Sequence, residues 1–293
     1  MCLFPKRIKI KLKNGFETYM DVPCNKCIEC LNTRVSDWVF RLNAEYAHCY
    51  RAIFVTLTYN DDTVPSKGVS VDDIQKHFKR VRKHLKTFRY YCTAEYGTKT
   101  LRPHYHYIAF TNDNVTLNEF YSIIDSCWSK GFINMKPLTK GRIIYCIGYL
   151  KGQFTPPGMN KVFSLMSRRP AIGYQMLENA QFVKHCQDTD YKYITNNGHK
   201  MHLPRYYKKK LHDVECTPVD IIKVKCAQCM KAYFEKLDYV NKFHCVVDVD
   251  FFFDPCNNAI LNKDKENFYR YVHEKAVNKD FTLKQKNKKT RRL

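Results

Sequence analysis

The stretch LRPHYHYIAF, residues 101–110, combines the pattern of a buried β-strand with two histidines. Side chains on a strand alternate between its two faces with a period of two. We therefore expect His104 and His106 on one face. Tyr105 and Tyr107 would then lie on the other face. Two neutral imidazoles on one face can bind one divalent metal ion, with room for another ligand. The alternative is that both histidines are ordinary strand residues.

The preceding segment offers a third metal ligand. RYYCTAE, residues 89–95, has the composition of another strand, and the loop YGTKTLRP can return the chain antiparallel to it. Glu95 would then lie alongside the two histidines. Glu29, Asp61 and Asp62 remain alternative carboxylates.

The wider pattern predicts an α+β fold with a central, largely antiparallel sheet flanked by helices. Strands are expected at 52–59, 89–95, 104–110 and 132–136, and helices after Ser70, from Thr116 to Trp128 and within 141–152. Composition divides the chain into a Cys-rich segment and helix (1–50), a core (51–155), a basic extension (156–215) and a C-terminal region (216–293). The last stretch, KQKNKKTRRL, is expected to be a mobile basic tail.

The charge balance indicates a polyanionic partner. Lys and Arg total 50 against 28 Asp and Glu, which gives a formal charge of +22, and the sequence also holds 21 Tyr and 19 Phe. Basic residues interspersed with aromatic ones favour a nucleic acid over a membrane surface. The sequence contains no GxxxxGK[ST] phosphate loop, so an ATP-driven helicase is not expected.

Two short stretches, MSRRPAIG and LPRYYKKKL, are candidates for DNA contact. Cationic side chains can bind backbone phosphates, and tyrosines can stack on unpaired bases. The alternative is a solvated charged surface. The candidates are Arg168, Arg169, Arg205, Tyr206, Tyr207, Lys208, Lys209 and Lys210.

The N-terminal cysteines have the spacing of metal ligands. Cys24, Cys27 and Cys30 lie in PCNKCIEC, and Cys2 could supply a fourth thiolate for a structural zinc ion. Reduced, partly buried thiols are the equally weighted alternative. A second group contains a lone CxxC, which we interpret as plain thiols: Cys226 and Cys229, with Cys216 or Cys245 nearby.

The cysteine content also bears on the compartment. The chain has 14 cysteines, but its N-terminal stretch MCLFPKRIKIKLKNG alternates apolar and basic residues, unlike a signal peptide. No run approaches the roughly 18 apolar residues of a membrane span. We expect a soluble, intracellular protein whose cysteines are buried or bind metal rather than form disulfides.

The segment IIYCIGYLKG carries two tyrosines four residues apart. Tyr145 and Tyr149 would share one face of a helix, where an aromatic core stripe is the alternative reading. A phenol with a pKa near 10 is a poor nucleophile unaided. A metal ion that polarises a phosphate would reduce this deficit, and two tyrosines would permit two successive phosphoryl transfers.

Taken in order, FVTLTY, EYGTKTLRPHYHYIAF and YCIGY resemble the three motifs of HUH endonucleases, the rolling-circle replication initiators, here with Tyr105 between the histidines. MCLFP, PCNKCIECLNTRVSDWVFRL, MSRRPAIG and LPRYY resemble more closely the replication-associated protein of gokushoviruses, the small single-stranded DNA microviruses that include the chlamydial phages. The resemblance spans roughly the first two thirds of the chain and implies an HUH endonuclease-like core at 51–155.

The resemblance implies a nickase that joins a tyrosine to the 5′ phosphate of origin DNA, frees a 3′ hydroxyl for synthesis and later rejoins the displaced strand. His104, His106 and Glu95 would bind Mg or Mn. Tyr145 and Tyr149 would be the alternating nucleophiles. Lys151 is a supporting candidate, although relatives tend to have lysine three residues after the second tyrosine rather than two.

The implied partners are viral origin DNA, a host helicase and a host polymerase, with no membrane, in the cytoplasm of a bacterial host cell. Two rival functions remain. A non-enzymatic zinc-containing DNA-binding protein would bind DNA without cutting it. A metal-dependent hydrolase would cut DNA without a covalent tyrosine intermediate.

Overall fold

The computed structural model describes residues 2–11, 15, 17–98, 100–151, 154–189, 191–196, 199–211, 234–235, 238, 242 and 262–290. The chain forms two compact units, Met1–Leu31 with Asp213–Leu293, and Asn32–His212. The four-part division drawn from composition stays a prediction. Among the described residues, no helix has the length and apolar character needed to cross a membrane.

The second unit is built on a five-stranded antiparallel sheet with the strand order β6-β3-β5-β4-β7. Its strands are β3 (Arg51–Tyr59), β4 (Arg89–Tyr96), β5 (Pro103–Thr111), β6 (Gly131–Pro137) and β7 (Ser164–Met166). The α+β class with a central antiparallel sheet and flanking helices is thus confirmed. The strand β5, which carries the two histidines, lies at the centre of the sheet between β3 and β4.

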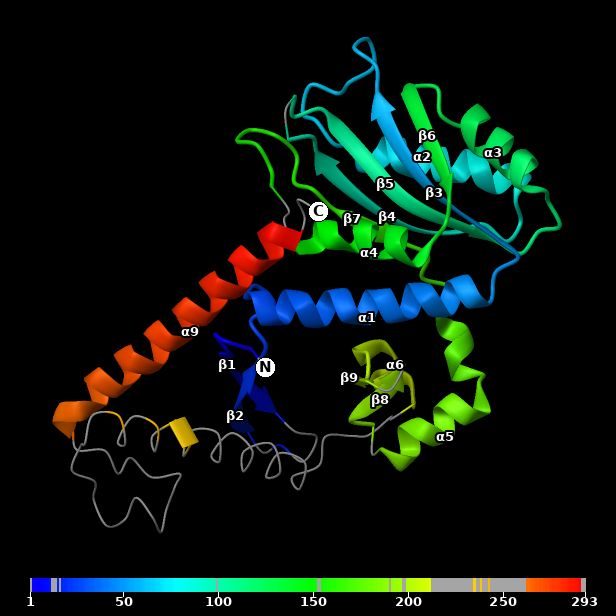
Figure 1. Cartoon of the computed structure of the whole chain (residues 1–293). Coiled ribbons are helices and arrows are strands. Elements are labelled where there is room, and N and C mark those ends of the chain that lie inside the picture. The colour runs from blue at the N-terminus through cyan, green and yellow to red at the C-terminus, as the bar shows by residue number, and fades with distance from the viewer. Residues whose placement is uncertain are drawn as a thin grey trace. The chain divides into compact units, whose positions relative to one another are not determined.

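Helices α2 (Val71–His84) and α3 (Leu117–Ser126) cover one face of the sheet (Figure 1). The side chain of Ser70 caps α2 by accepting a hydrogen bond from the Asp73 amide, and Thr116 begins α3 with a capping box. Their apolar sides supply a buried core on this face. The predicted starts of both helices are confirmed by these caps.

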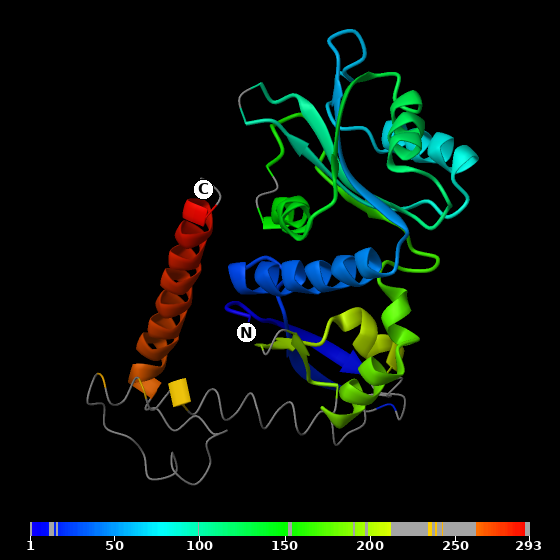
Figure 2. The same cartoon turned by 45° about the vertical axis from the view of Figure 1, so that its right-hand side comes forward.

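Helices α1 (Ile28–Ala47) and α4 (Lys140–Gly148) lie on the other face of the sheet, as Figure 2 shows in a turned view. Leu42 of α1 and Ile143 and Ile147 of α4 pack against Phe54 and Ile108 from the strands. A 3₁₀ turn, η1 (Tyr149–Lys151), follows α4 directly. The second of the two predicted tyrosines is therefore the residue at which the α-helix becomes a 3₁₀ turn.

The rest of the second unit contains η2 (Tyr174–Leu177), α5 (Ala180–Asp188), β8 (Tyr193–Asn196), β9 (His199–His202) and α6 (Arg205–Leu211). A small core joins these elements around Phe182, Leu203 and Tyr207. The side chain of Tyr207 has no exposed surface, and its hydroxyl donates to the carbonyl of Gly173 at 2.8 Å. The prediction that Tyr207 stacks on a DNA base is wrong, because packing of α6 turns its ring into this core.

The first unit contains the antiparallel hairpin β1 (Lys6–Lys11) and β2 (Glu17–Val22), the start of α1, and α9 (Asn262–Thr290). Asp280 of α9 accepts a hydrogen bond at 2.8 Å from the Ile28 amide, at the N-terminus of α1. Lys279 pairs with Glu29 at 3.0 Å. The stretch expected to be a mobile tail is helical as far as Thr290, which corrects that prediction.

Candidate active site

The strand β5 directs His104 and His106 to the sheet face that α4 covers, the face shared by Phe54 and Ile108. The register places Glu95 of β4 directly opposite His104. The carboxylate Oε1 of Glu95 lies 2.6 Å from Nε2 of His106. All three predicted metal ligands therefore lie on one face of the sheet, and two of them are in direct contact.

Two threonines of β3 hold the other nitrogen of each imidazole. Oγ1 of Thr58 lies 2.9 Å from Nδ1 of His104, and Oγ1 of Thr56 lies 3.0 Å from Nδ1 of His106. These contacts leave Nε2 of each ring for other partners. Sequence reasoning missed both threonines, although they alternate along FVTLTY with the same period of two as the histidines.

The hydrogen bonds define the protonation of these rings. A carboxylate only accepts, so Nε2 of His106 donates to Glu95 and its Nδ1 accepts from Thr56. A hydroxyl can donate or accept, so Thr56 still fits if Nε2 exchanges its proton for a metal ion. Burial lowers the pKa of His104 below its ordinary value. At neutral pH this keeps its imidazole in the neutral form that binds metals.

The two tyrosines converge on His106 from α4 and η1. The ring of Tyr149 stacks on that of His106 with centroids 4.7 Å apart and an interplanar angle of 1°. Tyr145 approaches the same imidazole edge-on at 5.8 Å. The hydroxyl of Tyr149 donates a hydrogen bond to the hydroxyl of Tyr145. Two phenol oxygens thus lie next to each other beside one histidine.

The two phenols differ in environment. The side chain of Tyr145 is 54% exposed, which leaves its oxygen accessible to a substrate from solution. Burial raises the pKa of Tyr149 well above 10, and the hydrogen bond with Tyr145 and the negative charge of Glu95 act in the same direction. Tyr149 is therefore the more strongly protonated donor of the pair, and Tyr145 is the accessible acceptor.

The donor set fits a divalent cation in chemical type. Two imidazole nitrogens and one carboxylate oxygen are ligands that Mn²⁺ accepts, and the proton shared by His106 and Glu95 lies where a cation would bind both groups. The alternative carboxylates have other partners. Asp61 forms an ion pair with Arg102, and Glu29 pairs with Lys279 in the first unit.

The first unit contains a separate cluster of four thiols. The sulfurs of Cys2, Cys24, Cys27 and Cys30 all lie within 4.8 Å of one another. Cys24 and Cys30 are 3.9 Å apart, and so are Cys27 and Cys2. A tetrahedral zinc ion with Zn–S bonds of about 2.3 Å sets its sulfurs about 3.8 Å apart. The four predicted cysteines thus form a cluster suited to a structural metal such as zinc.

Backbone amides stabilise negative charge on these sulfurs. The amide of Cys27 donates to Sγ of Cys24 at 3.3 Å, and the amide of Leu3 donates to Sγ of Cys27 at 3.4 Å. Burial alone would raise the pKa of Cys24, but the amides of Cys27 and Lys26 outweigh it and lower the pKa to about 6. Burial instead raises the pKa of Cys30 to about 12.

The remaining predicted residues are spread over the second unit. Arg168 and Arg169 follow β7 and are exposed, while Tyr206 is half-buried with the Arg41 guanidinium 4.3 Å above its ring. Lys151 ends η1 and is half-buried. The four cationic candidates on α6 are exposed: Arg205, Lys208, Lys209 and Lys210. The second cysteine group, Cys216, Cys226, Cys229 and Cys245, lies outside the described residues.

Comparison with known proteins bears on the strands and helix of this site. The family model of the viral replication-associated protein ORF2 matches residues 52–154. The matched span contains both histidines of β5, Glu95 and both tyrosines. The resemblance to viral replication-associated proteins is confirmed.

Three viral relatives support it. Replication-associated protein ORF2 of Spiroplasma virus 4 is 30% identical over 153 residues, or 44% of this chain and 47% of that protein. ORF4 of Chlamydia phage 1 is 25% identical over 212 residues, or 65% and 53%. VP4 of Bdellovibrio phage phiMH2K is 26% identical over 251 residues, or 74% and 77%. The chain spans about half the length of the first two of these replication-associated proteins.

One solved structure is also similar, the hypothetical protein ORF119 from Sulfolobus islandicus rod-shaped virus 1. It has 18% sequence identity and a TM-score of 0.26, and the match covers 38% of this chain and 88% of that chain. At this TM-score the similarity supports no conclusion about fold or function.

Proposed function

We propose that this protein initiates rolling-circle replication of a small single-stranded DNA bacteriophage by nicking one strand of the double-stranded replicative form at the origin. The observation that carries the proposal is the convergence of the Tyr145 and Tyr149 hydroxyls beside His106, on the sheet face that also holds His104 and Glu95. Its similarity to viral replication-associated proteins supports a role in DNA replication.

The proposed cleavage is a transesterification. A tyrosine oxygen attacks the scissile phosphorus and loses its proton, while the bond from phosphorus to the 3′ oxygen breaks and that oxygen takes up a proton. The products are a phosphotyrosine on the 5′ side and a free 3′ hydroxyl that can prime synthesis. One phosphodiester replaces another, so the later rejoining step needs no ATP.

We assign the first attack to Tyr145. Its oxygen is exposed and accepts the Tyr149 hydrogen bond, which would stabilise the negative charge that develops on Tyr145 as it loses its proton. Tyr149 would cut the regenerated origin in the following round. The freed 3′ hydroxyl would then attack the first phosphotyrosine, close the displaced strand into a circle and release the Tyr145 phenol.

His104, His106 and Glu95 would hold Mg²⁺ or Mn²⁺. When bound, the cation would supply positive charge to the non-bridging phosphate oxygens. Thr58 and Thr56 would fix the imidazole orientations through Nδ1, so that Nε2 of each ring faces the phosphate-binding side. Lys151 is retained as a supporting residue at the end of η1.

We also propose that the four cysteines of the first unit hold one structural zinc ion. The support is the matched pair of 3.9 Å sulfur separations and the amide hydrogen bonds to the sulfurs. Metal analysis should find about one zinc per chain in the wild type and little in Cys24→Ser. An unchanged zinc content in Cys24→Ser would contradict the proposal, and Cys49→Ser, outside the cluster, is the matched control.

The proposed partners are viral origin DNA, a host helicase and a host polymerase, with the bacterial host cytoplasm as the place of action. The sequence lacks a GxxxxGK[ST] loop, which supports a separate helicase. Separation of long duplexes by the purified protein with ATP would contradict this assignment.

The direct test looks for a covalent adduct. Purified protein is mixed with labelled single-stranded origin DNA and Mn²⁺ or Mg²⁺, and the products are separated on a denaturing gel. The wild type should form a metal-dependent adduct that weakens in His104→Ala and disappears in the Tyr145→Phe, Tyr149→Phe double variant. Tyr50→Phe, which removes an exposed hydroxyl elsewhere, should behave as the wild type.

The other outcomes identify the rival functions. Cleavage without an adduct would indicate a metal-dependent hydrolase. Binding without cleavage, on DNA that contains the origin, would indicate a non-enzymatic zinc-containing DNA-binding protein.

A further inference from the structure

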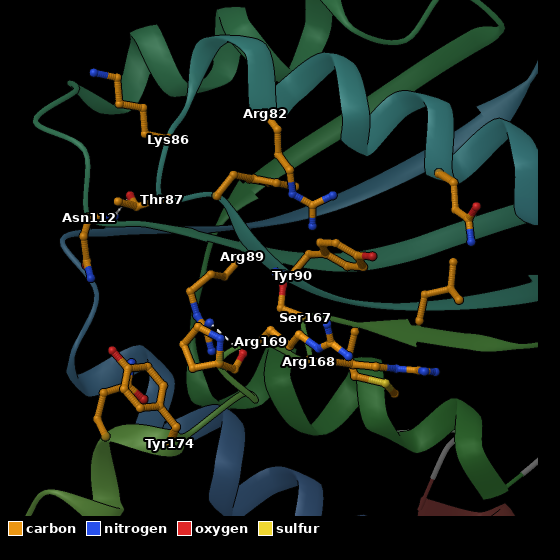
Figure 3. A pocket seen from close by; sticks show the side chains of 16 residues that line it. Arg82, Lys86, Thr87, Arg89, Tyr90, Asn112, Ser167, Arg168, Arg169 and Tyr174 are labelled. Carbon is orange, nitrogen blue, oxygen red and sulfur yellow. Dashed lines mark hydrogen bonds between the residues drawn. The ribbon is translucent and has the colours of Figure 1, made fainter.

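A cleft of about 850 Å³ lies at the end of β4 away from Glu95. Its walls come from the C-terminal end of α2, the start of β4, and the segment that follows β7 (Figure 3). In this view Arg82 lies above Tyr90, while Arg168 and Arg169 lie below it. Three segments distant in sequence thus contribute to one hollow.

The cleft is strongly cationic. Arg82, Lys86, Arg168 and Arg169 line it and are all exposed. Among the described residues, those that line it include no aspartate or glutamate. Four positive charges around one concave surface repel one another and attract an anion, and a low-dielectric wall strengthens both effects.

A fifth cation in the wall is already neutralised. Arg89 forms a two-point ion pair with the buried Glu45 and donates to the carbonyl oxygens of Pro170 and Ala171. Its role is to fix the wall to α1. The guanidinium of Arg82 instead lies over the ring of Tyr90 at 5.3 Å, which keeps its full positive charge available to a ligand.

Size and ring content favour a polymeric anion over a single phosphate. A volume of this size holds several nucleotide-sized groups. The aromatic rings of Phe88, Tyr90 and Tyr174 contribute to the lining beside the cations. Cationic side chains beside aromatic rings are the usual surface for unpaired nucleic acid.

We propose that this cleft binds the sugar–phosphate backbone of single-stranded DNA at a distance from the reacting phosphate. Arg82, Lys86, Arg168 and Arg169 bind successive phosphates. The inference deepens the proposed function, on which it rests for the identity of the strand. It extends the predicted contact of Arg168 and Arg169 by two residues of α2 and its end that the sequence did not single out.

The spacing along β4 sets the length of strand required. Arg89 and Glu95 are six positions apart on one strand, which corresponds to about 20 Å. At about 3.4 Å per nucleotide, a stacked strand needs roughly six nucleotides to reach from one site to the other. Oligonucleotides that extend at least this far from the cut on one side should bind more tightly than shorter ones.

The test is the salt dependence of binding, measured by fluorescence anisotropy with a labelled single-stranded oligonucleotide. The pairs Arg82→Gln with Lys86→Gln, and Arg168→Gln with Arg169→Gln, should each reduce the slope of log K against log salt by about 1.4, or about 0.7 per phosphate contact. The matched control is Lys79→Gln with Lys83→Gln, which removes two exposed charges of α2 that do not line the cleft.

The readout separates this inference from the proposed chemistry. The Tyr145→Phe, Tyr149→Phe double variant should retain the full slope, because it lacks only the nucleophiles. Lost slope in the cleft variants without any wild-type cleavage would sustain the cleft and overturn the nickase. Equal slopes in the cleft and control variants would overturn the cleft. A larger dependence on the four residues for duplex than for single-stranded DNA would overturn the single-strand assignment.

Discussion

Histidine–tyrosine contacts occur on both faces of the central sheet, and the two faces use them differently. On the face covered by α2 and α3, His77 lies 2.9 Å from the hydroxyl of Tyr107, and neither side chain has exposed surface. On the opposite face, His106 stacks on Tyr149, and the phenol chain ends at Tyr145, which is 54% exposed. The first arrangement is closed within the core, whereas the second reaches solvent.

The hydrogen bonds explain the difference. Nδ1 of His77 faces the carbonyl of Cys127 at 3.1 Å, so it donates there and Nε2 accepts from Tyr107. Both ring nitrogens therefore have fixed partners. His106 is bonded to Thr56, which can reverse its role, and to Glu95, which can also bind a cation. The same residue types thus give a rigid core on one face and an exchangeable site on the other.

Removal of one histidine from each face should break the comparison most clearly. His104→Ala should reduce adduct formation at least about a hundredfold, because a metal ligand is lost. His77→Ala should instead lower the free energy of unfolding by about 2–4 kcal/mol, since it leaves a cavity and two unpaired polar groups. Adduct rates under native conditions and urea unfolding measure the two effects. Equal loss of adduct in both variants would contradict the functional separation of the faces.

The tyrosine pair provides the next largest effect. Tyr145→Phe should reduce the first cut by about a hundredfold, because the accessible acceptor oxygen is lost. Tyr149→Phe should leave the first cut within about tenfold of the wild type but prevent rejoining of the displaced strand. Single-turnover cleavage and circularisation of a labelled strand distinguish the two steps. The reverse order of effects would show that Tyr149 attacks first.

The threonines sharpen the comparison at the level of orientation. Thr58→Val should weaken the Mn²⁺ dependence of cleavage by about ten- to a hundredfold, because Nδ1 of His104 loses its partner. Thr58→Ser keeps a hydroxyl and should restore most of the metal affinity. The measurement is the Mn²⁺ concentration at half-maximal cleavage. If Ser is as weak as Val, the methyl group rather than the hydrogen bond positions the ring.

Local periodicity accounts for what the sequence could predict. Alternation along β5 assigned the histidines and tyrosines to opposite faces, and hydroxyl residues before apolar runs located the starts of α2 and α3. The spacing of Cys24, Cys27 and Cys30 brought three thiols together within one turn and the start of α1. Each of these features depends on residues close together in the chain.

Features that depend on distant segments were not predicted. The bonds from Thr56 and Thr58 to the histidines require the β3–β5 register. The cleft requires α2, β4 and the segment after β7 to meet. Tyr207 follows Tyr206 in a basic run, yet its neighbour in space is Gly173, and that contact buries it. Composition cannot distinguish a buried tyrosine from an exposed one when the packing partner is more than thirty residues away.

The pH dependence of stability gives the smallest expected effect and concerns the closed face. Burial lowers the pKa of His77 from 6.5 to about 4, and the nearby Arg80 acts in the same direction. Between these two values the unfolded chain binds a proton that the folded chain does not, so this group makes the folded state less stable as the pH falls from 6.5 to 4. The total is roughly 3 kcal/mol, with no further change below about pH 4.

His77→Gln removes this titration while it retains a donor and an acceptor for Cys127 and Tyr107. Urea unfolding of both proteins across this pH range should therefore give converging stabilities, with the variant losing less as the pH falls. Carboxylates titrate in both proteins, so the difference between the two curves isolates the histidine. Parallel curves would mean that His77 accepts a proton in the folded state, and the closed face would then be as exchangeable as the face that carries His106.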